Sequence, residues 1–319
     1  MAKDTLYTNG VIAAREKYLL KDRILKLCDL GAEEALRAVC ESGFGKNAEV
    51  ASVYEYEKLV AADEAAIDGF IREYSPSRAE AEYLLTWRDF HNAKAAVKAK
   101  HLSIGLENML APEGLIPIDV ITDCVNSGKY SPLGEKLGEA VEKASALFEG
   151  EEVSGAETGI IFEKALFARL KEICAKNGIL KKLLTVKADM TNILTALRSA
   201  EEEYAARCFV EGGKLSEKQL RALFDGDAEK FKGTPYYEFI KKCFADKAAG
   251  RPLTEAEKLF DIFEAEYFSA KKYELEKSSP FLYYVFRRRA ENVNVRILFV
   301  CLLAGMKEGE IRRRLRLIK

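Results

Sequence analysis

The sequence predicts an all-α protein made of three related helical lobes. Three observations lead to this fold class: apolar residues return every three or four positions, helix-breaking residues are few, and one polar signature occurs three times. The chain has 319 residues, of which 48% are apolar and 32% charged, and only seven are proline. Such a composition is typical of a globular protein with long, solvated helices and excludes a disordered or fibrous chain.

The apolar periodicity is that of amphipathic helices. Ile161, Leu166, Leu170 and Ile173, for example, recur at helical spacing, and no stretch alternates apolar and polar residues as a β-strand would. Glycine and proline occur at intervals that separate helices, namely at 75–76, 111–114, 128–132, 149–155, 212–213, 233–235, 250–252, 278–280 and 305.

The polar signature is an acid followed three residues later by asparagine. Its copies are Asp89 with Asn92, Asp189 with Asn192, and Glu291 with Asn294. The acids are 100 and 102 residues apart, and apolar residues take equivalent positions around each one. These residues are Tyr83, Leu84, Ala93 and Val97 in the first copy, Leu183, Leu184, Ile193 and Leu197 in the second, and Val285, Phe286, Val295 and Phe299 in the third. Residues three apart project from one side of a helix, so each copy predicts a long helix with a polar pair beside an apolar stripe.

A glycine-bearing turn and a shorter helix are predicted to follow each signature helix. The segments are 113–121, 212–223 and 305–315. In the second, Ser216 is the expected N-cap, with Gln219 completing a capping box. Repetition of this unit predicts three lobes, at residues 1–112, 113–212 and 213–319.

Two roles are open for the acid and asparagine pairs. In the first, which we favour, they bond to neighbouring helix ends or to basic side chains within each lobe and fix one helix orientation. In the second, the three pairs line a central cavity and contact a partner.

Signatures of catalysis and cofactor binding are missing from the sequence. No phosphate-binding glycine loop and no serine nucleophile motif occurs. The two histidines, His91 and His101, are ten residues apart and point to different faces, so we favour ordinary packing histidines over a metal site with Asp89. The seven cysteines are scattered and predict reduced, packed thiols. We therefore expect neither an enzyme nor a bound cofactor or metal.

Neither a membrane span nor a secretory signal is predicted. The longest apolar run, residues 293–306, is interrupted by Asn294 and Arg296 and is shorter than the ~20 residues that a bilayer requires. The first 18 residues mix charges of both signs without an apolar core. These features predict a cytosolic location.

Basic residues gather towards the C-terminal end. Residues 287–319 contain ten basic and three acidic side chains, a net charge of +7. The candidate residues for docking an acidic partner are Arg287, Arg288, Arg289, Arg312, Arg313 and Arg314. Nucleic acid is disfavoured because aromatic residues do not alternate with these arginines as in a stacking surface.

Several segments resemble the C subunit family of V-type and A-type ATPases and ATP synthases, whose eukaryotic V-ATPase member is called d. They are Pro-Phe-Leu-Tyr-Tyr-Val-Phe-Arg-Arg-Arg-Ala-Glu-Asn-Val-Asn-Val-Arg-Ile-Leu at 280–298, Glu-Ile-Arg-Arg-Arg-Leu at 310–315, Trp-Arg-Asp-Phe-His-Asn-Ala-Lys at 87–94, and Gly-Thr-Pro-Tyr at 233–236. The resemblance covers essentially the whole chain. The run at 287–289 is more basic than the family pattern.

The resemblance implies a pseudo-threefold, funnel-like body with a central cavity and no catalytic activity. Such a protein lies between the membrane rotor ring of proteolipid subunits and the central-stalk subunits D and F, peripheral to the cytoplasmic face of the membrane. The alternative from the residues alone is a generic helical-repeat scaffold that binds unrelated proteins.

Overall fold

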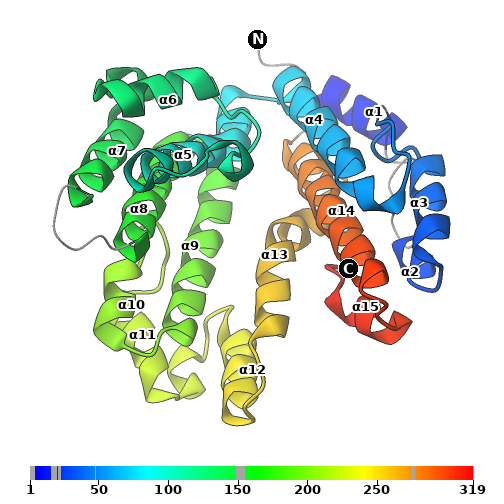
Figure 1. Ribbon diagram of the computed structural model, residues 1–319. Helices are drawn as coiled ribbons and strands as arrows, with labels where there is room; N and C mark the ends of the chain where they lie inside the picture. Colours follow the sequence, from blue (N-terminus) through cyan, green and yellow to red (C-terminus); the bar gives the residue numbers. More distant parts are fainter. Residues whose placement is uncertain are drawn as a thin grey trace. The chain divides into compact units, whose positions relative to one another are not determined.

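The computed structural model describes residues 4–15, 20, 23–46, 48–148, 155–274 and 277–318. Every regular element in these ranges is helical, which confirms the predicted all-α class (Figure 1). The α-helices are α1 (Thr5–Arg15), α2 (Arg23–Leu27), α3 (Ala32–Glu41), α4 (Tyr56–Tyr74), α5 (Arg78–Leu102), α6 (Ile118–Ser127), α7 (Glu135–Leu147), α8 (Gly155–Cys174), α9 (Gly178–Arg198), α10 (Glu202–Cys208), α11 (Glu217–Arg221), α12 (Tyr237–Ala248), α13 (Thr254–Ser269), α14 (Ser279–Leu303) and α15 (Glu308–Arg314). Within the described ranges, none of these helices is both long and apolar enough to cross a membrane.

Packing contacts divide the chain into two compact units. Unit 1 joins Met1–Glu80 to Thr254–Lys319, and unit 2 is Ala81–Leu253. Unit 1 is therefore discontinuous in sequence, and unit 2 is inserted into it. The division into three lobes stays a prediction.

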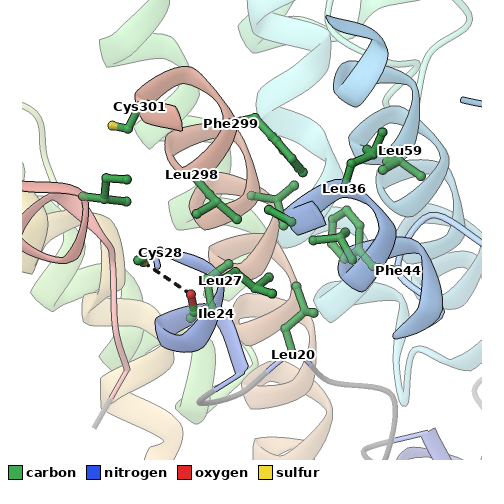
Figure 2. Close-up of a cluster of buried hydrophobic side chains, with 14 of the residues drawn as sticks. Leu20, Ile24, Leu27, Cys28, Leu36, Phe44, Leu59, Leu298, Phe299 and Cys301 are labelled. Atoms are coloured by element: carbon green, nitrogen blue, oxygen red, sulfur yellow. Dashed lines mark hydrogen bonds between the residues drawn. The ribbon is translucent and has the colours of Figure 1, made fainter. Parts of the chain in front are cut away.

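Helix α14 is the central element of unit 1. It packs against α1, α2, α3, α4, α13 and α15. Figure 2 shows how its core brings the beginning and the end of the sequence together: Leu20 and Leu36 lie in one buried cluster with Leu298 and Phe299. Tyr56 of α4 stacks on Phe299 with ring centroids 5.2 Å apart. Each large apolar side chain buried in this way stabilises the fold by about 1.5–3 kcal/mol.

The core of unit 2 forms around α5 and the helices that follow it. Phe90 and Val97 of α5 are buried with Ile121 of α6, Val141 of α7 and Phe162 of α8. Helix α8 packs in turn against α9. The first two signature helices, α5 and α9, are thus both built into the packing of this unit.

Two helix starts in unit 2 are fixed by side chains. At α11, the hydroxyl of Ser216 accepts the N–H of Gln219, and Gln219 Oε1 accepts the N–H of Ser216, which confirms the predicted capping box. At α9, Asn177 Oδ1 accepts the N–H groups of Ile179 and Leu180, both at 3.1 Å. These bonds satisfy N–H groups that a helix start leaves without partners and so set where each helix begins.

Candidate functional site

The first signature pair holds a turn against its own helix. Asn92 of α5 forms two hydrogen bonds with the backbone of Ala111: Oδ1 accepts its N–H at 2.8 Å, and Nδ2 donates to its carbonyl at 3.2 Å. Asp89 Oδ1 accepts the consecutive N–H groups of Leu115 and Ile116 at 2.9 and 3.1 Å. The side chains of Asp89 and Asn92 are buried. The pair therefore clamps residues 111–116 to α5.

The second pair, on α9, makes the same four contacts. Asn192 accepts the N–H of Val210 at 2.8 Å and donates to its carbonyl at 2.9 Å. Asp189 Oδ1 accepts the N–H groups of Lys214 and Leu215 at 2.8 and 2.9 Å. Because the donors are consecutive in the backbone in both copies, the carboxylate imposes the same local path on both turns.

A glycine precedes the two clamped N–H groups in each of these turns. A Cβ atom on Gly114 would lie 2.3 Å from Asp89 Oδ1, and one on Gly213 would lie 2.1 Å from Asp189 Oδ1. Real side chains do not approach so closely, so only glycine fits while the carboxylate keeps its position. The sequence contains a signal for this requirement, because the glycines follow their acids by 25 and 24 residues. The predicted turns included both glycines without relating them to the acids.

Asp189 also binds a side chain from the 233–236 segment. Tyr236 donates its hydroxyl to Asp189 Oδ2 at 2.9 Å, so both carboxylate oxygens are used. Burial raises the pKa of Tyr236, and the neighbouring Asp189 carboxylate raises it further. The tyrosine thus remains a neutral hydrogen-bond donor at physiological pH.

The third pair, on α14 of unit 1, keeps the asparagine contact. Asn294 accepts the N–H of Arg316 at 2.6 Å and donates to its carbonyl at 3.0 Å. Glu291 lies within ion-pair distance of two arginines of its own helix, 3.9 Å from Arg287 and 4.0 Å from Arg288. The contacts described for the asparagines therefore all join a signature helix to the backbone that follows it.

The structure places the arginines of the 287–289 run among partners within unit 1. Arg288 forms an ion pair with the buried carboxylate of Asp63 on α4 and donates to the Tyr284 hydroxyl at 3.1 Å. Burial raises the pKa of Asp63, while the Arg288 charge opposes that rise. Arg287 donates to the Tyr283 hydroxyl at 2.9 Å, and Arg289 is half-buried. A docking role for these arginines stays a prediction.

The C-terminal arginines differ in exposure. Arg312 is ion-paired with Asp29, at 3.2 Å, and with Glu308. Arg313 and Arg314 are exposed, and Arg313 donates to the carbonyl of Gly309 at 3.2 Å. Of the six predicted docking residues, Arg313 and Arg314 therefore present the most accessible positive charge.

The histidines take part in packing contacts. His91 Nε2 lies 2.9 Å from the carbonyl of Met109, and His101 stacks on Phe148 with ring centroids 4.8 Å apart. Among the residues that the structure describes, no three histidine, cysteine or acidic side chains are grouped so that they could hold a metal ion.

The comparison with known proteins gives the family. Residues 8–314 match the family described as ATP synthase (C/AC39) subunit. The chain is also similar to the C subunit of the V-type sodium ATPase of Enterococcus hirae, with 20% identity over 314 residues that cover 92% of each chain. The family match spans both units and all three signature copies, which confirms the resemblance found in the sequence. The chain belongs to the C/AC39 family of accessory subunits of V-type ATPases and ATP synthases.

Proposed function

We propose that this chain is the non-catalytic connector of a rotary V/A-type ATPase. In this role it joins the central-stalk subunits D and F to the membrane rotor ring of proteolipid subunits and transmits torque for proton or sodium transport. The observation that carries the proposal is the family match over residues 8–314. The similar Enterococcus hirae protein is named as a subunit of a sodium ATPase, which supports a place in an ion-transporting complex at the cytoplasmic face of a membrane.

The clamped turns support a mechanical role. A part that transmits torque must resist displacement of its loops relative to its helices. In the first two copies, four hydrogen bonds from one acid and one asparagine tie a turn to its helix. The two from the carboxylate are charge-assisted and therefore among the stronger ones.

We further propose that the three signature helices belong to the lobes 1–112, 113–212 and 213–319 of a pseudo-threefold funnel. Its central cavity would receive the end of the stalk's coiled-coil subunit. Three pseudo-equivalent lobes cannot match a ring of many identical subunits contact for contact. The ring interface is therefore expected to be polar, adaptable and sensitive to salt.

Gel filtration with the cognate subunits tests the connector. The purified chain is mixed with subunits D and F, and separately with the detergent-solubilised rotor ring, at low and high salt. We expect co-elution with both at low salt and loss of the ring complex at high salt. Failure to co-elute with either at low salt would leave the helical-repeat scaffold as the better explanation.

Charge reversal at Arg313 and Arg314 tests whether the exposed arginines dock an acidic partner. The double variant Arg313→Glu/Arg314→Glu should weaken binding roughly tenfold at low salt, because attraction becomes repulsion at the edge of an interface. The melting temperature should hardly change, since both side chains are exposed. The control Lys26→Glu/Arg37→Glu changes the net charge of unit 1 by the same amount at exposed residues outside the run. Equal binding by both double variants would show that only net charge matters.

A further inference from the structure

A small cavity lies beside the third signature copy in unit 1. Its volume is about 70 Å³, several times the ~15 Å³ that one water molecule needs. Arg287, Ala290, Glu291 and Asn294 of α14 form one wall. Ile24, which Figure 2 shows in the neighbouring core, and the half-exposed Leu317 form others. The cavity thus combines two buried polar side chains with an apolar surround.

The same positions of the first two copies are covered by the glycine turn. A Cβ on Gly114 would contact Asp89 and, at 3.1 Å, the carbonyl of the residue four before it, Leu85. A Cβ on Gly212 would contact the residue one before Asp189, Ala188, at 3.9 Å. In the third copy, the residues four and one before the acid are Arg287 and Ala290, and both line the cavity. The cavity therefore takes the place of the turn.

The asparagine contact gives the register independently. In the first two copies, the acid binds the N–H groups four and five residues after the backbone that the asparagine holds. In the third copy, Asn294 holds Arg316, so the equivalent groups lie beyond Ile318, the last described residue. Among the described residues, Glu291 instead has its own-helix arginines nearby.

We propose that this cavity binds a turn of a neighbouring subunit, whose two consecutive backbone N–H groups are accepted by Glu291. The proposal rests on the proposed function, because the neighbour is another subunit of the same complex. Glutamate is one methylene longer than the aspartate of the other copies, which moves the carboxylate outward by about 1.5 Å. The turn can therefore carry a small side chain where Gly114 and Gly213 carry none.

Photo-crosslinking in the assembled complex tests the proposal. p-Benzoyl-phenylalanine is placed at Leu317, which lines the cavity and is 38% exposed. After irradiation, mass spectrometry should identify a crosslink to a turn of a second subunit. Glu291→Gln in the same chain keeps the shape but removes the charge, and should lower the yield about tenfold. A probe at Leu115, also 38% exposed, is the matched control, and its yield should not respond to Glu291→Gln.

The outcomes separate this proposal from the proposed function. A complex that assembles but crosslinks from Leu317 only within the chain would show that the chain covers the cavity itself, and would overturn the inference alone. An intersubunit crosslink whose yield ignores Glu291→Gln would also overturn it. Failure of the unlabelled chain to assemble would overturn the connector role and, with it, the inference.

Discussion

Replacing Gly213 by alanine is expected to lower the free energy of unfolding by about 3 kcal/mol or more. The new Cβ would lie 2.1 Å from Asp189 Oδ1, so either the carboxylate or the turn must move. Movement of the carboxylate breaks its bonds to the N–H groups of Lys214 and Leu215 and leaves a buried charge with fewer donors. Overpacking and the loss of charge-assisted hydrogen bonds therefore act together.

Urea denaturation measures the overall effect of Gly213→Ala, and hydrogen exchange measures the local one. The N–H groups of Lys214 and Leu215 should exchange faster in the variant. Gly159→Ala is the matched control, because Gly159 lies within α8 and a Cβ there meets nothing within 4 Å. That change should stabilise the protein by about 0.5–1 kcal/mol through helix propensity. If both variants were equally stable, Asp189 would not be the group that requires glycine.

The second large effect is expected at the buried ion pair of unit 1. Arg288→Met should cost about 3–5 kcal/mol, because it leaves the Asp63 carboxylate buried without its opposite charge. Asp63 is 2% exposed and cannot turn to solvent without repacking α4 against α14. The double variant Asp63→Asn/Arg288→Met should recover much of the loss, since no charge then remains buried. Urea denaturation of the two variants and the unchanged chain measures the difference.

The pH dependence gives this prediction a second readout. Burial raises the pKa of Asp63 in the folded chain, and loss of Arg288 removes the charge that opposes the rise. A folded state with the higher carboxyl pKa binds the proton more readily than the unfolded state, so stability falls as pH rises above the ordinary value of about 3.9. The loss in Arg288→Met should therefore shrink as the pH is lowered from neutral, whereas the loss in the double variant should not. A loss independent of pH would assign the effect to packing rather than charge.

The parts of this fold that the sequence predicted are local ones. Helical periodicity, the threefold signature and the capping box at Ser216 all depend on residues within a few turns of one helix. The partners of the signature residues were not predicted, because Asn92, Asn192 and Asn294 bind backbone groups. The residues that carry those groups are as different as alanine, valine and arginine, and they follow their asparagines by 19, 18 and 22 residues.

Long-range contacts leave no periodic trace in the sequence. Arg288 and Asp63 are 225 residues apart, and Tyr236 and Asp189 are 47 apart. The sequence grouped Arg288 with Arg313 because both belong to basic runs, but charge alone does not report burial. Only the packing of α4 against α14 separates an arginine that neutralises an internal carboxylate from one that is exposed.

The discontinuity of unit 1 has a consequence for biosynthesis. Its core joins Leu36 and Leu59 to Leu298 and Phe299, so the first 80 residues leave the ribosome long before their packing partners exist. Unit 2 is complete in sequence before α14 is translated and is free to fold first, as domains generally fold as units during synthesis. The nascent N-terminal helices must wait with apolar surface exposed, which makes this interval the stage at which the chain most needs a chaperone.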